Sequence, residues 1–164
     1  MKKNRISKNW INKQRRDIYV RRSKVDGYRS RAAYKLIEID EKFKIFKNGI
    51  SVIDLGSAPG SWSQYLSKKI KNSKIVSIDL REMEAIDNTI QVLGDFTEEK
   101  NQSKIKGFFK SNVDVVLSDM AVNTTGNKNI DSIYTGELCM EAMLFSKKIL
   151  NNDGKFISKI FMGS

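Results

Sequence analysis

The chain contains no histidine, one cysteine and one proline among its 164 residues. Without histidine it cannot form a Cys/His zinc site, and Cys139 alone cannot form a disulfide within the chain. No apolar run is long enough to span a bilayer, and the basic residues 1–5 are not followed by the apolar segment of a signal peptide. We therefore expect a cytoplasmic protein that binds no metal and has no membrane partner.

Positive charge is concentrated in the first fifth of the chain. The formal net charge is +11; residues 1–31 hold twelve Lys and Arg against two Asp, whereas the later residues hold eighteen against seventeen acidic ones. A solvated tail is the simplest alternative. Trp10, Tyr19 and Tyr28 lie among these charges, however, and arginine binds phosphates while aromatic faces stack on unpaired bases. The pattern predicts a basic RNA-binding arm over residues 1–27, with RNA contacts from Arg15, Arg16, Arg21, Arg22, Arg29 and Arg31.

Residues 28–164 are expected to form one α/β domain. Short runs rich in β-branched residues alternate there with segments of helical periodicity, and no internal repeat is present. A helix over 30–43 is predicted to precede strands over 52–55, 75–79, 89–93, 113–118 and 155–159, with helices over 62–70, 98–110 and 133–150 between them. This order predicts a Rossmann-like fold with a mostly parallel sheet.

Polar residues stand at the carboxyl ends of the predicted strands, where α/β sheets bind ligands. Gly56 and Gly60 bound a turn that lets the backbone approach a ligand closely, but their spacing is not that of a pyrophosphate-binding fingerprint. Asp79 comes 25 residues after Asp54, where an acidic residue is placed to accept hydrogen bonds from ribose hydroxyls. Asp95, at the end of the third predicted strand, is placed to accept a hydrogen bond from an adenine amino group. Adenosine without pyrophosphate predicts S-adenosylmethionine and disfavours a nicotinamide dehydrogenase.

Several further motifs occur in a consistent order from about Trp10 to the last residue. They are Arg29-Ser30-Arg31-Ala32, Lys35-Leu36, Asp54-Leu55-Gly56, Ala58-Pro59-Gly60, Trp62-Ser63-Gln64-Tyr65, Gly94-Asp95-Phe96, Ser118-Asp119-Met120-Ala121 and Lys159. Together they resemble the FtsJ/RrmJ-type ribosomal RNA large-subunit methyltransferases, which methylate a ribose 2′-hydroxyl. The resemblance implies a Rossmann-like fold, S-adenosyl-L-methionine as donor, a Lys-Asp-Lys-Glu catalytic tetrad, and a monomer that acts on ribosomal RNA within the large subunit.

The resemblance also assigns roles to individual residues. Lys35, Asp119 and Lys159 would be the first three members of the tetrad. Taken singly, either lysine is more typical of a surface charge, and Trp62 is more typical of a core residue. Lys159, however, interrupts an apolar run, where an unpaired charge is costly. The implied cofactor contacts are Gly56, Gly60, Trp62, Asp79, Asp95 and Asp119.

The chemistry of methyl transfer gives an independent reason for two lysines and an acid. A ribose oxygen attacks a sulfonium methyl group, so the acceptor is a weakly acidic alcohol that must lose its proton. A lysine can assist as a base or as an electrostatic stabiliser of the developing alkoxide. Asp119 would orient the lysine and favour the cationic donor. Both roles of the lysine stay open at this point.

The sequence departs from the family pattern in three places. Ser61 replaces a glycine, and Val122 replaces a proline. In the family, strands that would lie beyond Ser164 supply the tetrad glutamate, so no residue here is assigned that role. We expect a sheet that ends at its fifth strand and little turnover by these 164 residues alone.

These observations predict a ribose 2′-O-methyltransferase of large-subunit (23S) ribosomal RNA that acts late in ribosome assembly. Two alternatives stay open. One is a 2′-O-methyltransferase of transfer RNA or of a messenger RNA cap. The other is a catalytically weak RNA-binding assembly factor.

Overall fold

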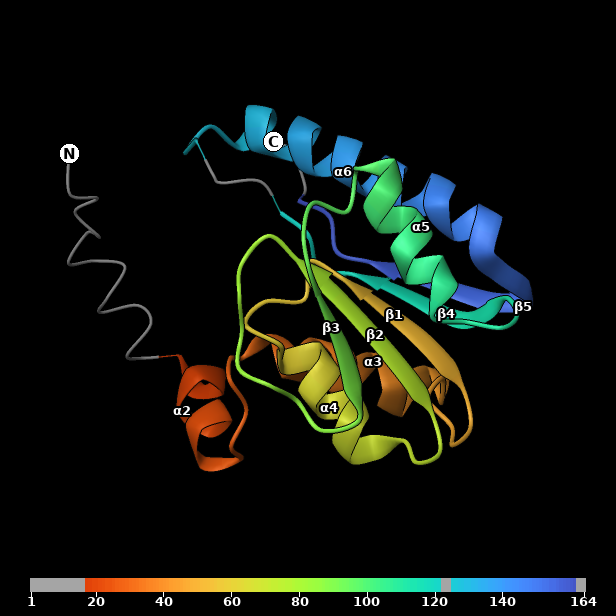
Figure 1. Cartoon of the computed structure of the whole chain (residues 1–164). Coiled ribbons are helices and arrows are strands. Elements are labelled where there is room, and N and C mark those ends of the chain that lie inside the picture. The colour runs from red at the N-terminus through yellow and green to blue at the C-terminus, as the bar shows by residue number, and fades with distance from the viewer. Residues whose placement is uncertain (1–16, 122–124, 162–164) are drawn as a thin grey trace.

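The computed structural model describes residues 17–121 and 125–161, which form one parallel five-stranded sheet between two layers of helices (Figure 1). The strands are β1 (Ser51–Leu55), β2 (Lys74–Asp79), β3 (Thr89–Leu93), β4 (Val113–Ser118) and β5 (Leu150–Ser158), in the spatial order β3-β2-β1-β4-β5. The helices are α2 (Ile18–Val25), α3 (Ala32–Phe43), α4 (Ser61–Lys69), α5 (Glu99–Gly107) and α6 (Lys128–Ile149). The predicted fold class is confirmed, and the elements from α3 onward follow the predicted order, whereas α2 was not predicted.

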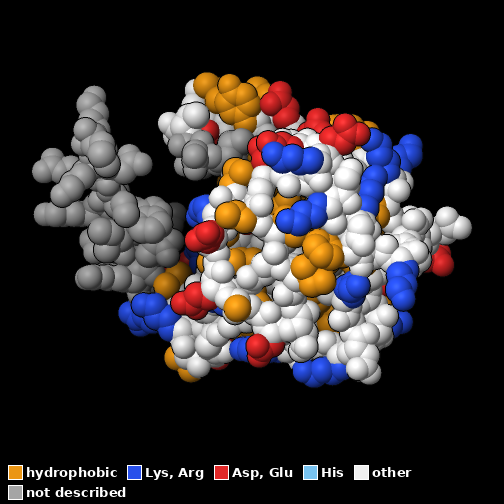
Figure 2. Space-filling model, in the orientation of Figure 1, with side chains coloured by type: hydrophobic (Ala, Val, Ile, Leu, Met, Phe, Trp, Pro, Cys, Tyr) orange, Lys and Arg blue, Asp and Glu red, His pale blue; other side chains and the backbone are white. Residues whose placement is uncertain are grey.

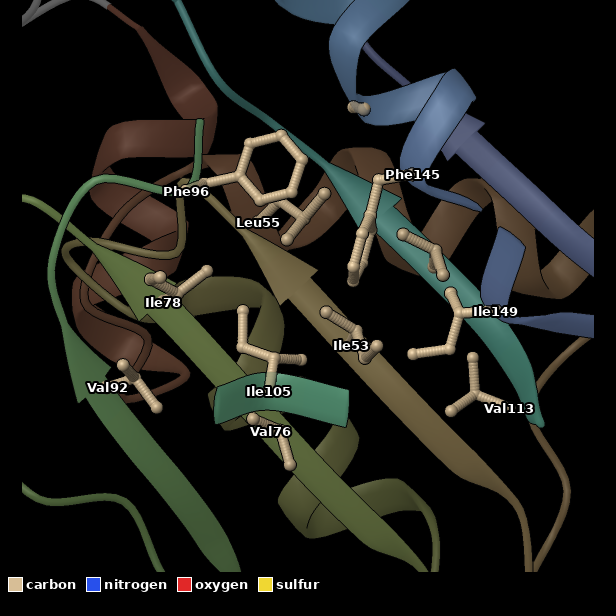
Figure 3. Packing of buried hydrophobic residues seen from close by; sticks show 12 residues of the cluster. Ile53, Leu55, Val76, Ile78, Val92, Phe96, Ile105, Val113, Phe145 and Ile149 are labelled. Carbon is tan, nitrogen blue, oxygen red and sulfur yellow. The ribbon is translucent and has the colours of Figure 1, made fainter. Parts of the chain in front are cut away.

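The central strands β1, β2 and β4 are buried on both faces, which explains why they appear in the sequence as nearly continuous hydrophobic runs. Figure 1 shows α5 and α6 on one face and α3 and α4 on the other. Under α5 and α6, the side chains of Ile53, Val76 and Val113 pack with Ile105 and Phe145 (Figure 3). The opposite core contains Leu36, Val52, Trp62, Leu66, Ile75, Val115 and Leu117.

The last two predicted elements begin earlier than the sequence suggested. Helix α6 starts at Lys128 instead of residue 133, because the side chain of Asn127 caps it by accepting from the amides of Asn129 and Ile130 at 3.1 and 3.4 Å. Strand β5 starts at Leu150 instead of residue 155. Val113 pairs with Leu150 and Val115 pairs with Lys155, so the register between β4 and β5 shifts between these two pairs. The irregularity interrupts the sequence pattern of the strand, which is why the prediction began only after it.

The parallel ladder aligns the carboxyl ends of the strands along one edge. Gly56 N donates to Ile78 O at 2.9 Å, Asp119 N to Leu55 O at 3.2 Å, and Lys159 N to Ser118 O at 2.9 Å. These bonds continue the ladder by one residue past β1, β4 and β5. The residues that follow three different strands are therefore held side by side, as the sequence pattern predicted.

Part of the expected basic arm is helical. Asp17 caps α2 by accepting from Tyr19 N at 2.9 Å. The helix packs against α3 through Tyr34, whose ring centroid lies 5.5 Å from that of Tyr19 and 5.1 Å from the guanidinium carbon of Arg22. Residues 18–25 are thus docked on the domain. Trp10, Arg15 and Arg16 lie outside the described residues.

Helix α6 carries a row of exposed hydrophobic side chains, and Figure 2 shows hydrophobic surface at the top of the molecule, where this helix lies. These residues are Ile130, Ile133, Tyr134, Met140, Met143 and Leu144. Charged residues interrupt the row, and within residues 17–121 and 125–161 no helix is long and apolar enough to cross a membrane.

Candidate active site

The turn that follows β1 is packed so closely that two of its positions require glycine. Gly56 and Gly60 have φ angles of +71° and +102°, which side chains disfavour. A Cβ on Gly56 would lie 2.9 Å from Met120 Cα, and one on Gly60 would lie 2.8 Å from Arg29 Nη1. The glycines therefore allow close approach, and in this structure the atoms that approach belong to the protein itself.

Two carboxylates lie at the ends of β2 and β3. Asp79 Oδ2 accepts from Ala58 N at 2.9 Å, and its Oδ1 accepts from Arg81 N at 2.9 Å, so Asp79 fastens the glycine turn to the sheet. Asp95 Oδ1 accepts from the amide and hydroxyl of Thr97, both at 2.8 Å. No described residue donates to Asp95 Oδ2, and a carboxylate oxygen can accept more than one hydrogen bond. Both acids can accept further bonds from a ligand.

A third carboxylate, Asp54, is fully buried beneath the turn. Ser63 Oγ donates to its Oδ2 at 2.6 Å, whereas its Oδ1 has no partner among the described residues. Burial raises the pKa of Asp54 to about 7, and the nearby charges of Asp119 and Asp79 add to the shift, although the bonds from Ser63 oppose it. The sequence patterns placed Asp54 in a motif but did not predict that its carboxylate is buried.

Lys159 and Asp119 come together where β5 and β4 end. The ammonium group of Lys159 forms an ion pair with Asp119 Oδ1 and donates to the backbone oxygen of the same residue at 3.2 Å. Their side chains are 22% and 20% exposed, so the pair is accessible from one side only. The Lys159 Nζ also lies 5.5 Å from the ring centroid of Phe161.

Lys35 faces the same site from α3. It lines a cleft of about 430 Å³ together with Lys159, and it forms no hydrogen bond or ion pair with another described residue. Trp62 also borders the cleft, but its ring is buried and its indole nitrogen donates to Ala32 O at 2.8 Å. The other lining residues are Glu38, Ile39, Lys42, Phe43, Ile157 and Ser158.

The arginines predicted to bind RNA lie in different surroundings. Arg21 and Arg22 are exposed on α2, and Arg22 pairs with Asp26 at 3.3 Å. Arg31 forms an ion pair with Asp17. Arg29 points into the domain, where its guanidinium binds backbone carbonyl groups, a role that sequence reasoning missed.

Comparison with known proteins shows which family contains a chain with this glycine turn, these strand-end acids and this lysine–aspartate pair. A model of the FtsJ-like methyltransferase family matches residues 28–164. The chain belongs to this family. Two sequence relatives are both named ribosomal RNA large subunit methyltransferase E. The one from Pelagibacter ubique is 74% identical over the whole chain, which covers 81% of that relative. The one from Rickettsia bellii is 48% identical over 96% of this chain and 72% of the relative.

A solved structure agrees with this assignment to the FtsJ-like family. The crystal structure of a ribosomal RNA methyltransferase from Plasmodium falciparum resembles the chain with a TM-score of 0.76 and 35% sequence identity. The similarity covers 84% of this chain and 80% of that one.

One of the two substitutions relative to the FtsJ-like pattern has a visible consequence. Ser61 begins α4 and is buried, and its hydroxyl lies 2.8 Å from that of Ser30, within hydrogen-bonding distance. The serine thus joins α4 to the segment before α3. Val122, which stands where the family has proline, lies outside the described residues.

Proposed function

We propose that this protein is an S-adenosylmethionine-dependent ribose 2′-O-methyltransferase that acts on large-subunit (23S) ribosomal RNA. The observation that carries the proposal is the Lys159–Asp119 ion pair, which lies beside the glycine turn and opens onto a cleft shared with Lys35. Membership of the FtsJ-like family and the names of the relatives support the reaction and the RNA class.

The residues at the ends of β1, β2 and β3 fit the donor. Asp79 and Asp95 retain acceptor capacity for ribose hydroxyls and an adenine amino group. Gly56 and Gly60 allow the turn after β1 to pack closely against the neighbouring chain, which fixes its position beside these acids. Asp119 would add negative charge beside the donor, which favours a cationic sulfur. The bound donor would supply a methyl group that is already activated for transfer.

Lys159 and Lys35 would act on the acceptor. Asp119 holds the Lys159 ammonium through its carboxylate and its backbone oxygen, and an ammonium has three N–H groups, so donor capacity remains for the ribose oxygen. Lys35 reaches the same cleft and can stabilise the negative charge that develops on that oxygen. Both lysines would compensate the negative charge on the oxygen. The hydroxyl proton would pass to Lys159 if that lysine acts as a base, and to solvent if it acts only as an electrostatic stabiliser.

The basic arm would supply affinity for RNA. Arg21 and Arg22 extend from α2, and Arg15 and Arg16 precede it in the sequence. The chain of residues 1–27 thus carries positive charge up to the edge of the domain, and phosphate contacts of this kind dominate nucleic-acid affinity. We place the protein in the cytoplasm, as a monomer that meets its substrate in the large ribosomal subunit.

The proposal is tested by transfer of a labelled methyl group to large ribosomal subunits that lack the modification. The enzyme for this assay is the chain extended with the part of the Pelagibacter ubique relative that it does not cover. Label should appear in a ribose of the large-subunit RNA, and Asp119→Asn should abolish it. Binding of donor and RNA without turnover would contradict the proposal and favour an assembly factor, and methylation of a base or of transfer RNA would contradict it as well.

A further inference from the structure

Arg29 connects two loops of the donor site. Its Nη1 donates to Pro59 O at 3.0 Å in the turn after β1, and also to Glu84 O at 2.9 Å in the loop after β2. Its Nη2 donates to Ala85 O at 3.0 Å. One guanidinium group therefore joins three carbonyl oxygens from two loops that are separated in sequence by a complete helix and strand.

The arginine is fixed in this position by its own backbone. Arg29 N donates to Gln64 Oε1 at 3.1 Å, and Gln64 Nε2 donates back to Gly27 O at 2.8 Å. The segment before α3 is therefore attached to the first turns of α4. The Arg29 side chain is only 19% exposed. It lies directly beside Gly60, and a Cβ on that residue would be only 2.8 Å from Arg29 Nη1.

The loop after β2 contains no helix of its own, so contacts from other elements hold it in place. Residues 80–88 link β2 directly to β3, and this loop begins beside Asp79, the acid proposed to bind the donor ribose. Two side chains outside the loop donate hydrogen bonds to its backbone. Gln91 Nε2 donates to Glu84 O at 3.0 Å, and Ser67 Oγ donates to Asp87 O at 2.5 Å. Arg29 joins residues 84 and 85 of this loop to Pro59 in the glycine turn. The same loop also reaches the turn through Arg81 Nη2, which donates to Ala58 O at 3.2 Å, and through Met83 Sδ, 3.9 Å from Ser57 Oγ.

We propose that Arg29 is a positioning residue of the donor site, which holds the turn at Gly60 and the loop at residues 84–85 at the separation that the adenosine requires. This inference rests on the proposed function. It differs from the sequence-based expectation that Arg29 binds RNA. A guanidinium that is four-fifths buried and already bound to three carbonyl groups has little freedom to reach a phosphate.

The planar fork of arginine is necessary for this arrangement. A lysine ammonium is a single point charge and cannot span carbonyl groups of two loops in the same fixed geometry. Arg29→Lys preserves the charge, and thus any general attraction for RNA, while it removes the connection between the loops. The substitution therefore separates positioning from phosphate binding.

The test is calorimetric titration of the chain with S-adenosylhomocysteine, the demethylated product, which contains the same adenosine. Arg29→Lys should weaken binding on the order of tenfold, equivalent to about 1.4 kcal/mol. Its midpoint of urea denaturation without ligand should stay near that of the parent. Hydrogen exchange should accelerate in residues 80–88 and not in the core strands. The matched control is Lys74→Ala, which removes a bond to Phe108 O at the opposite end of β2 and should leave affinity unchanged.

Chemical rescue provides the second measurement. Arg29→Ala leaves a site of guanidinium shape, and methylguanidinium at concentrations far below denaturing ones should restore ligand affinity, whereas methylammonium should not. Unchanged affinity in Arg29→Lys would overturn the inference, and so would a loss that merely follows a drop in global stability. If the parent protein itself binds no S-adenosylhomocysteine, the proposed function is wrong, and the role of Arg29 in the donor site is wrong with it.

Discussion

Lys159 and Asp119 lie one residue beyond the ends of neighbouring strands and form an ion pair across them. Ser118 and Ser158 are paired in the β4–β5 register, and the Lys159 amide continues this ladder by donating to Ser118 O at 2.9 Å. The strand register therefore brings together two charged residues that are 40 positions apart in the sequence. Because the pair is partly exposed and borders the cleft, its charges remain available to a substrate.

Substitution of Lys159 should affect methyl transfer far more than donor binding. In the chain extended with the segment from the Pelagibacter ubique relative, Lys159→Ala should abolish transfer, because the lysine acts mainly in the transition state. Donor affinity measured by calorimetry should stay within a few fold. Lys155→Ala, an exposed lysine on the same strand, is the control.

Lys159→Arg distinguishes the two roles left open for the lysine. Arginine retains the charge but does not act as a base, so loss of transfer supports proton removal by Lys159. If the arginine variant is nearly as active as the parent, Lys159 is an electrostatic stabiliser and not a base. If Lys159→Ala still turns over, the catalytic assignment is wrong.

Asp79 should contribute directly to donor affinity. Asp79→Asn removes a charged acceptor and should weaken binding of S-adenosylmethionine by about 1.5–3 kcal/mol. Calorimetry of the parent should also detect no binding of NAD, since the turn lacks the pyrophosphate fingerprint. Asp153→Asn at an exposed position is the control. Unchanged affinity in a folded Asp79→Asn protein would exclude the ribose assignment.

Asp54 should make the free energy of unfolding depend on pH. Its folded-state pKa is raised from 3.8 to about 7, so the native state holds a proton that the unfolded state releases. Stability should fall as pH rises from about 4 to about 7, by an upper limit of roughly 4 kcal/mol, and then level off. Urea denaturation across this range should show the fall in the parent and a smaller one in Asp54→Asn.

Asp114 provides a control of opposite sign. Although burial raises its pKa, hydrogen bonds from Ser51 and Asn151 outweigh that effect and lower it. The stability that Asp114 contributes is therefore present above its unfolded pKa and is lost as pH falls through its folded value. Asp114→Asn should leave the decline between pH 4 and 7 intact. A decline that survives unchanged in Asp54→Asn would contradict the assignment to Asp54.

The basic arm should govern the salt dependence of RNA binding. Deletion of residues 1–16 removes seven Lys and Arg but keeps Asp17 and α2. The slope of log affinity against log salt should become shallower by about 0.7–0.9 for each phosphate that is no longer neutralised. Fluorescence titration with an RNA fragment at several salt concentrations measures the slope. Neutralising Lys147 and Lys148 on α6 should leave it unchanged, and an unchanged slope in the deletion variant would refute the role of the arm.

Much of the architecture was predictable from local sequence patterns. Short β-branched runs separated by segments of helical periodicity predicted parallel strands, and parallel strands place their carboxyl ends along one edge. Asp79, Asp119 and Lys159 follow such runs directly, so their neighbourhood followed from the order of elements alone. Whether a residue directly follows a strand can be recognised from the local sequence, and the pairing of parallel strands then brings such residues close together.

Other features depended on tertiary contacts that no local pattern contains. Arg29 looks like one more arginine of a basic arm, yet it binds carbonyl groups 30, 55 and 56 residues further along the chain. Asp54 shares its strand-end position with the other acids, but the packing of α4 over it removes water and raises its pKa. The sequence by itself determined which residues reach the carboxyl edge of the sheet. The tertiary structure decided which charges there are buried, bound or open to a ligand, because burial depends on elements that come from distant parts of the chain.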